Sequence, residues 1–452
     1  MQKQSVTTFE EAEKYINSIP RFTSKNTMED TKAFLHRLGD PDRRMRILHV
    51  AGTNGKGSVC AYMSAILQAA GYRVALFTSP HLVDIRERFT VDGEMISREE
   101  FLGAFLQVYH LLEFPETGDG RAEPAPDAQP CLPFYHPTYF EYLFFMAMVL
   151  FPEKHPDFCI LETGLGGRLD ATNAVSGKEL AVMTHISLDH VEYLGDTVEK
   201  IAGEKACIMH PGSPAVYWDT CPSVREVFER KAAELGVTAY SVSKNDYRFH
   251  GFVNKSIDFS VRTEYYNYIS LTLHTIAPYQ MENAALAVRA LEILDGGRTI
   301  REPQIRQGIA GCFWAGRMEE VLPEVYVDGA HNEDGIRAFL EAVAGDGHAG
   351  PRALLFSVVK DKDYESMAEE LVGSGLFDRV AAARMQTGRA LSPEALKRLF
   401  EQYPVYGCQV YDSVSEAFHE LVHSRRQNER VYIAGSLYLA GEIKELLKYD
   451  KF

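Results

Sequence analysis

The sequence predicts an α/β protein with two domains: a larger domain built on a phosphate-loop-type, mainly parallel sheet, and a smaller, Rossmann-like α/β domain that follows it. Three observations predict this fold class. Short apolar strand patterns alternate with helical patterns from residue 46 onward, a glycine-rich turn joins the first strand to the first long helix, and a second alternation begins after Arg317. We therefore divide the chain into residues 1–312 and 313–452, the second of an ordinary domain size.

Apolar periodicity and turn signals place the individual elements. In the larger domain they predict strands at 46–50, 73–77, 158–162 and 180–184, and helices near 57–70, 98–112, 138–150 and 197–209. Residues 245–275 alternate polar and apolar side chains without helix signals, which predicts a small antiparallel sheet. A helix from Met281 to Leu294 is expected to end at an Asp-Gly-Gly stop. In the smaller domain, strands are expected at 325–328, 353–357, 378–382, 406–410 and 430–434.

Composition narrows the classes of partner. The net charge of −16 argues against nucleic acid or an anionic membrane as a general partner. The longest apolar run, Tyr142 to Phe151, is too short to span a bilayer, and the N-terminus has no apolar signal core. Seven scattered cysteines are typical of reduced thiols, so we expect a cytoplasmic protein. The segment 114–137, rich in Pro, Gly and acidic residues, is expected to form a surface loop or lid.

The most informative segment is Gly52-Thr53-Asn54-Gly55-Lys56-Gly57-Ser58, which lies between a strand pattern and a helical pattern. This order points backbone N–H groups and a helix N-terminus at a phosphate. Lys56 supplies a positive charge for the terminal phosphates of ATP, and Ser58 supplies a hydroxyl for Mg²⁺. The match to the common phosphate loop is imperfect, because Val50 replaces its first glycine and Gly57 separates the lysine from the serine. The alternative is a glycine-rich turn with a surface lysine.

Three more candidate site residues follow in the larger domain. Glu162 ends an apolar strand, where a carboxylate close to a phosphate loop can hold magnesium. His190 comes after the next strand and is a candidate metal ligand, with Asp189 orienting its neighbours. Lys205 lies on the helix expected at 197–209. The alternatives are a capping glutamate, a structural histidine and a surface lysine.

The glycine-rich loop resembles the ATP loop of the Mur ligase superfamily, which makes amide bonds by way of acyl phosphates. The loop and the spacing of Glu162, His190 and Lys205 together resemble those of folylpolyglutamate synthase and its bifunctional relative, dihydrofolate synthase. Further matching motifs occur in order along nearly the whole chain: Phe77–Leu82, Leu161–Asp170, Trp314–Glu319, Asp328–Asn332, Lys360–Asp363 and Gly435–Leu439.

This resemblance implies an ATP-dependent ligase that adds L-glutamate to the γ-carboxylate of folates and also joins glutamate to dihydropteroate. It implies ATP contacts from Thr53, Asn54, Gly55, Lys56, Gly57, Ser58, Gln280, Asn283, Arg317 and Asp328. It implies metal binding by Ser58, Ser79, Glu162 and His190, and by Lys205 once this lysine is carbamylated. The catalytic residues that it implies are Lys56, His190, Lys205, Arg317 and His331. The segment Leu82–Phe89 resembles a pterin-contacting loop.

Two positions depart from the family pattern, since Tyr279 stands where a histidine commonly precedes Gln280, and His185 stands where Asn or Ser is more usual. One alternative function is a peptidoglycan-precursor ligase of the same superfamily. Those enzymes carry an additional N-terminal domain, for which the roughly 45 residues before the phosphate loop are too few. Another alternative is a nucleotide switch without an acyl substrate. Such a protein does not need the candidate metal-binding residues Glu162, His190 and Lys205. We expect a monomer, and no residue decides whether dihydropteroate is a substrate.

Overall fold

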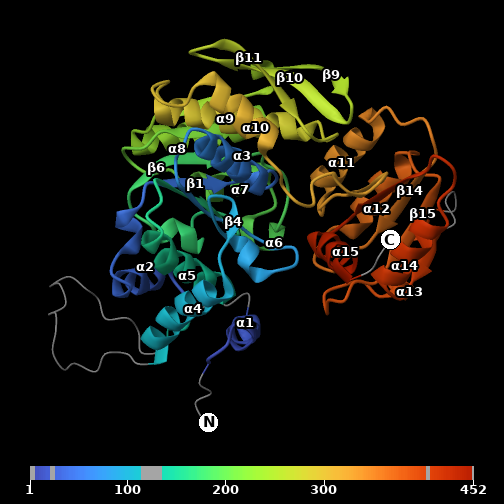
Figure 1. The fold of residues 1–452 in the computed structure, drawn as a ribbon, viewed down its shortest axis with the longest axis horizontal. Coiled ribbons are helices and arrows are strands. Elements are labelled where there is room, and N and C mark those ends of the chain that lie inside the picture. The colour runs from blue at the N-terminus through green and yellow to red at the C-terminus, as the bar shows by residue number, and fades with distance from the viewer. Residues whose placement is uncertain (1–5, 21–25, 114–134, 404–407, 450–452) are drawn as a thin grey trace.

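The structure is a computed structural model that describes residues 6–20, 26–113, 135–403 and 408–449 (Figure 1). Two α/β units lie side by side, one coloured blue to yellow and the other orange to red. The predicted fold class is therefore confirmed. The surface loop expected at 114–137 lies almost wholly outside the described residues.

The larger unit is built around an eight-stranded sheet in the order β4-β3-β2-β5-β1-β6-β7-β8. Strands β2, β5, β1, β6, β7 and β8 run parallel, and β3 and β4 form an antiparallel edge. All five residues of β1 are buried, as expected for a parallel strand covered on both faces. The strands are β1 (Ile47–Ala51), β2 (Val74–Phe77), β3 (Phe89–Val91), β4 (Glu94–Met95), β5 (Phe158–Glu162), β6 (Lys178–Met183), β7 (Ala215–Trp218) and β8 (Ala239–Val242).

Helices cover both faces of this sheet, because successive side chains of each strand point to opposite sides. Leu48 and Val50 of β1 pack against α3 (Lys56–Ala69), α9 (Tyr279–Asp295) and α10 (Glu302–Gly311). Ile47 packs on the other face, which is covered by α1 (Phe9–Ser18), α2 (Met28–Arg37), α4 (Arg98–Glu113) and α5 (Tyr139–Glu153). Beyond β1 that face is covered by α7 (Val198–Ala206) and α8 (Pro222–Leu235).

The expected antiparallel sheet is present as β9 (Tyr247–Val253), β10 (Ser256–Thr263) and β11 (Asn267–Leu273). The smaller unit has a six-stranded sheet in the order β12-β13-β17-β14-β15-β16. Its strands are β12 (Glu319–Leu322), β13 (Val325–Val327), β14 (Arg352–Phe356), β15 (Arg379–Ala383), β16 (Gln409–Tyr411) and β17 (Arg430–Ala434). Its helices are α11 (Glu333–Gly345), α12 (Tyr364–Gly373), α13 (Pro393–Glu401), α14 (Val414–His423) and α15 (Leu437–Tyr449).

The two units share one hydrophobic cluster. Ile276 and Ala277, which directly precede α9, are buried in the same cluster as Tyr326, Phe339 and Leu354 of the smaller unit. The segment that leads into α9 therefore belongs by sequence to the larger domain and by packing to the core of the smaller one.

Several elements differ from the expectation. The edge hairpin β3–β4, the pair β7 and β8 with α8 between them, and β12 were not predicted. The helix expected at 197–209 ends at Ala206 because the chain turns there, and a short helix α6 (Val191–Leu194) precedes it. Helix α9 begins two residues early, at Tyr279, directly after Pro278, whose φ of −59° and ψ of −32° are already helical.

The structure also bears on membrane-spanning helices and on the cysteines. No helix in the described parts of the chain is long and apolar enough to cross a membrane. The six cysteines that the structure describes are all free thiols, and Cys131 lies outside those residues.

Candidate active site

The glycine-rich loop lies between the end of β1 and the start of α3. The residues directly after β6 form hydrogen bonds with it. The backbone N–H groups of Thr53 and Asn54 donate to the His185 carbonyl at 2.9 and 3.3 Å. The Thr184 hydroxyl donates to the Asn54 carbonyl at 2.6 Å. A Cβ on Gly52 would lie 1.7 Å from the Thr184 hydroxyl, so only glycine allows this close approach. These contacts fix the path of the loop beside the end of β6.

The N-terminus of α3 faces the same loop. Gly55 precedes the helix with φ of +87°, and a Cβ there would lie 2.2 Å from the side-chain oxygen of Asn283. Lys56 is the first helical residue, and its ammonium donates to the Thr53 carbonyl at 3.1 Å. Unpaired N–H groups of the first helical turn and this lysine form a site suited to phosphate oxygens.

Replacing Gly55 with alanine is expected to weaken ATP binding by at least roughly tenfold, a loss of about 1.4 kcal/mol, because the added methyl group would collide with Asn283. Titration calorimetry with ATP measures this change. Gly71→Ala is a matched control, since Gly71 also has φ of +87° but has nothing within 4 Å of its Cβ. The control should lose stability by about 1–2 kcal/mol and keep its ATP affinity. Equal affinities for the two variants would contradict the role of Gly55.

Glu162 and Lys205 are buried on either side of this loop, with 3% and 4% of their surfaces exposed. Glu162 ends β5 directly beside Val50, and one of its carboxylate oxygens accepts the Ser79 N–H at 3.0 Å. Burial raises the pKa of the Glu162 carboxyl, and the positive charge of Lys56 opposes this rise. The Lys205 ammonium donates to the Gly52 carbonyl at 2.7 Å, and burial lowers its pKa to about 7.

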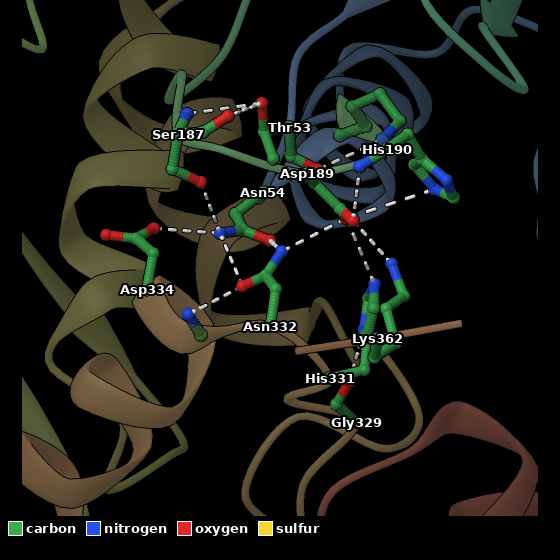
Figure 2. Close-up of polar contacts among 12 residues, drawn as sticks. Thr53, Asn54, Ser187, Asp189, His190, Gly329, His331, Asn332, Asp334 and Lys362 are labelled. Atoms are coloured by element: carbon green, nitrogen blue, oxygen red, sulfur yellow. Dashed lines mark hydrogen bonds and ion pairs between the residues drawn. The ribbon is translucent and has the colours of Figure 1, made fainter. Parts of the chain in front are cut away.

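Figure 2 shows a polar network around Asp189 that joins the two units. One Asp189 oxygen accepts from the Lys362 ammonium at 2.5 Å, and the other accepts from the Asn332 amide at 3.2 Å. Nε2 of His190 and Nε2 of His331 lie 3.9 and 3.8 Å from this second oxygen. Burial opposes ionisation of Asp189, but Lys362 and the histidines outweigh it and hold the pKa of this carboxyl well below its usual range.

Both histidines of this network are neutral at pH 7. Burial lowers the pKa of His190 to about 4 and that of His331 to about 3. Nδ1 of His331 lies 2.8 Å from the Gly329 carbonyl, which can only accept, so Nδ1 carries the proton. Nε2 of His331 therefore keeps a lone pair that can accept a hydrogen bond.

Two pockets adjoin the glycine-rich loop. The first is lined by Gly52 to Gly57 and by Glu162 and Lys205. The second is lined by residues of both units. The Gln280 amide donates to the Ser58 hydroxyl at 3.2 Å, and the Asn283 amide donates to the Gln280 carbonyl oxygen at 3.1 Å. Ser58 and Asn283 line this pocket together with Arg317 and Asp328. In the described part of the chain, the Arg317 side chain makes no hydrogen bond or ion pair, and it lines this pocket and the one beside the loop.

The two residues that depart from the family pattern both contact carboxylates of the smaller unit. The Tyr279 hydroxyl donates to Asp328 at 2.5 Å. Nε2 of His185 lies 3.4 Å from a carboxylate oxygen of Asp334, which also accepts from the Asn54 amide at 2.8 Å. Both departures therefore face the second pocket, at the boundary between the units.

The donor groups here suit a magnesium ion rather than an all-protein metal site. Within residues 6–20, 26–113, 135–403 and 408–449, no three His, Cys, Asp or Glu side chains form a group that could hold a metal. Ser58 and Glu162 offer oxygen ligands, and only one Glu162 oxygen accepts a hydrogen bond within those residues. Mg²⁺ binds through one or two carboxylates together with substrate phosphates and water, so these residues fit it.

The structure brings the candidate residues into two adjoining pockets. The loop from Gly52 to Gly57 lines one of them together with Ser79, Glu162, His190, Lys205, Arg317 and His331. Ser58, Asn283 and Asp328 line the other, and Gln280 contacts it through Ser58. Sequence reasoning missed the contacts of Lys362, Asn332 and Asp334, although the motifs Lys360–Asp363 and Asp328–Asn332 include the first two.

Glu87 shapes the segment Leu82–Phe89 beside the Ser79 turn. Its carboxylate accepts the N–H groups of Leu82, Val83 and Asp84 at 2.7, 3.1 and 2.9 Å. This segment is therefore an ordered loop next to the first pocket, and its contact with a pterin stays a prediction.

Comparisons with known proteins agree with this geometry. The Mur ligase middle domain matches residues 135–291, and the Mur ligase glutamate ligase domain matches residues 316–437. The dihydrofolate synthase/folylpolyglutamate synthase of Bacillus subtilis is 33% identical over 449 residues, which cover 98% of this chain and 100% of that protein.

Two solved structures are similar over nearly the full chain. E. coli FolC in complex with DHPP and ADP has a TM-score of 0.80 and 27% identity, covering 99% of each chain. An FPGS–AMPPCP–folate complex has a TM-score of 0.78 and 26% identity, covering 98% of this chain and 100% of that one. The chain therefore belongs to the Mur ligase superfamily of ATP-dependent ligases, in the family of folylpolyglutamate and dihydrofolate synthases.

Proposed function

We propose that this protein uses ATP to join L-glutamate to the γ-carboxylate of folates, and also to dihydropteroate. The observation that carries the proposal is a pocket in which the phosphate loop meets polar groups of both units: Glu162, His190 and Lys205 of the larger unit, and Arg317 and His331 of the smaller one. The double activity named for the Bacillus subtilis relative, and the complexes of similar structures with AMPPCP, folate, ADP and DHPP, support it.

The phosphate loop and Arg317 are the groups that would bind the ATP phosphates. The Lys56 ammonium, which donates to the Thr53 carbonyl at 3.1 Å, would bind a terminal phosphate oxygen. Arg317 supplies a second cation from the smaller unit. Gln280, Asn283 and Asp328 would contact the nucleotide from the adjoining pocket. Cations placed where charge accumulates on the transferring phosphoryl group lower the barrier to its transfer.

Magnesium, when bound, neutralises the phosphates and the substrate carboxylate that would otherwise repel each other. Ser58 and Glu162 would hold one ion, and Ser79, Glu162 and His190 a second. Lys205, as a carbamate, would be a further ligand for these ions. Its amine has a pKa lowered to about 7, so a substantial fraction is neutral at pH 7 and can add to CO₂, forming an N–C bond and releasing one proton.

The bond-making sequence has two steps. The folate carboxylate oxygen attacks the γ-phosphorus of ATP, and ADP leaves to give an acyl phosphate. The glutamate amine then attacks the acyl carbon, phosphate leaves, and the proton that the amine loses passes to the released phosphate or to water. Contact between the units, including Lys362 with Asp189, would exclude water that hydrolyses the acyl phosphate.

The test is ADP release by the purified protein with ATP, Mg²⁺ and L-glutamate, offering tetrahydrofolate and dihydropteroate in separate reactions. We expect release with both, dependent on glutamate. Release with tetrahydrofolate alone would leave only the polyglutamate-extending activity. Release with neither, while ATP still binds, would favour a different acyl acceptor or a nucleotide switch.

We further propose that the enzyme is a cytoplasmic monomer. The six cysteines within the described residues are all free, which supports a reducing compartment. Sedimentation of the purified protein tests the monomer.

A further inference from the structure

The carboxylate of Asp328 accepts hydrogen bonds from two other segments and from its own loop. One oxygen accepts from the Tyr279 hydroxyl at 2.5 Å and from the Met318 N–H at 2.9 Å, and the other accepts the Ala330 N–H at 2.8 Å. Asp328 is only 3% exposed. Met318 follows Arg317, and Ala330 precedes His331, so one carboxylate fixes both segments of the smaller unit that carry candidate catalytic side chains.

Tyr279 is the contribution of the larger unit to this arrangement. It lies in the first turn of α9, next to Gln280, whose amide donates to the Ser58 hydroxyl at the start of α3. Burial raises the pKa of the Tyr279 hydroxyl, and the negative charge of Asp328 raises it further, so the phenol keeps the proton that it donates. A continuous path of contacts thus runs from the phosphate loop helix to Arg317 and His331.

We propose that Tyr279 is a positioning residue: its hydroxyl holds Asp328, and through Asp328 it holds Arg317 and His331 in register with the phosphate loop. The residue does not itself need to touch the reacting atoms. The inference rests on the proposed function in one respect, namely that a nucleotide binds in the pocket that Tyr279 lines.

The test compares Tyr279→Phe with Tyr279→His. Phenylalanine keeps the packing and removes the donor, so we expect AMPPCP affinity and kcat each to fall at least about tenfold, the scale of losing one hydrogen bond to a charged acceptor. Histidine keeps an N–H donor and should restore both quantities to within about threefold of wild type. Titration calorimetry gives the affinity, and ADP release with the accepted folate gives kcat.

Tyr432→Phe is a matched control. The Tyr432 hydroxyl also donates to a carboxylate of the smaller unit, that of Asp346, but neither residue lines the two pockets. A merely structural role predicts the same pattern for both phenylalanine variants: lower stability with unchanged AMPPCP affinity and kcat. We expect that pattern for Tyr432→Phe alone.

Wild-type AMPPCP affinity in Tyr279→Phe would overturn the proposal, as would a Tyr279→His variant no better than Tyr279→Phe. A wild-type protein that binds AMPPCP but ligates no glutamate would overturn the proposed function, while the affinities would still decide the role of Tyr279.

Discussion

Glu162→Gln is expected to reduce ADP release to about one per cent of wild type or less, the scale of losing one preorganised charged group at a reacting centre. The substitution keeps the size of the side chain and an oxygen that accepts the Ser79 N–H. It removes the negative charge that we assign to magnesium. Initial rates at saturating Mg²⁺ measure the effect, and wild-type turnover would exclude a metal-binding role.

The same substitution should leave the fold at least as stable as before. Because burial raises the pKa of Glu162, folding becomes less favourable as this carboxyl ionises, and the amide escapes that cost. Glu141→Gln is the opposite case. Its buried carboxylate accepts hydrogen bonds from Asn26, Thr31 and Thr138 at 2.7, 3.0 and 2.7 Å, away from both pockets. That variant should lose stability and keep its turnover.

Lys205→Ala is expected to lose roughly a hundredfold or more in turnover, again the scale of one preorganised group. If the lysine acts as a carbamate, short carboxylates such as formate or acetate should partly restore the rate by occupying the space left by the side chain. Full activity without added carboxylate would contradict the assignment. An inactive variant that no carboxylate rescues would contradict the carbamate.

Lys178 offers a matched control for this experiment. It is also buried, burial also lowers its pKa to about 7, and its ammonium donates to Asn173 instead of the phosphate loop. Both lysines bind a proton in the unfolded chain up to about pH 10.4. The free energy of unfolding therefore increases as pH rises from about 7 to 10, and either alanine variant should make this increase smaller. Only Lys205→Ala should respond to carboxylates.

Local patterns explain why most of the fold could be predicted. The strand, glycine-rich turn and helix around Gly52–Ser58 are encoded by adjacent residues, and Glu162 follows from the end of an apolar strand. Strand β8, at the edge of the sheet, was missed because only Val242 of its four residues is buried, so it shows no apolar run. Strand β7 was missed although its four residues are all buried and it is no shorter than β2, which was predicted. Tertiary pairing within the sheet stabilises them.

The contacts between the two units could not be predicted in the same way. Lys362 and Asp189 are separated by 173 residues, and their ion pair depends on how two sheets are placed relative to each other. The sequence motif around Lys362 was visible, but a lysine among aspartates is typical of a solvated surface. The shifted pKa values of His190 and His331 likewise follow from burial that only the assembled site provides.

The shared hydrophobic cluster has a consequence for dividing the polypeptide. A cut after residue 312 would leave Ile276 and Ala277 on the first fragment, while the cluster that buries them would stay on the second. Each fragment would then present water with an apolar surface shaped for the other. Co-expressed halves should therefore find each other and reconstitute the ligase, whereas either half produced alone should aggregate.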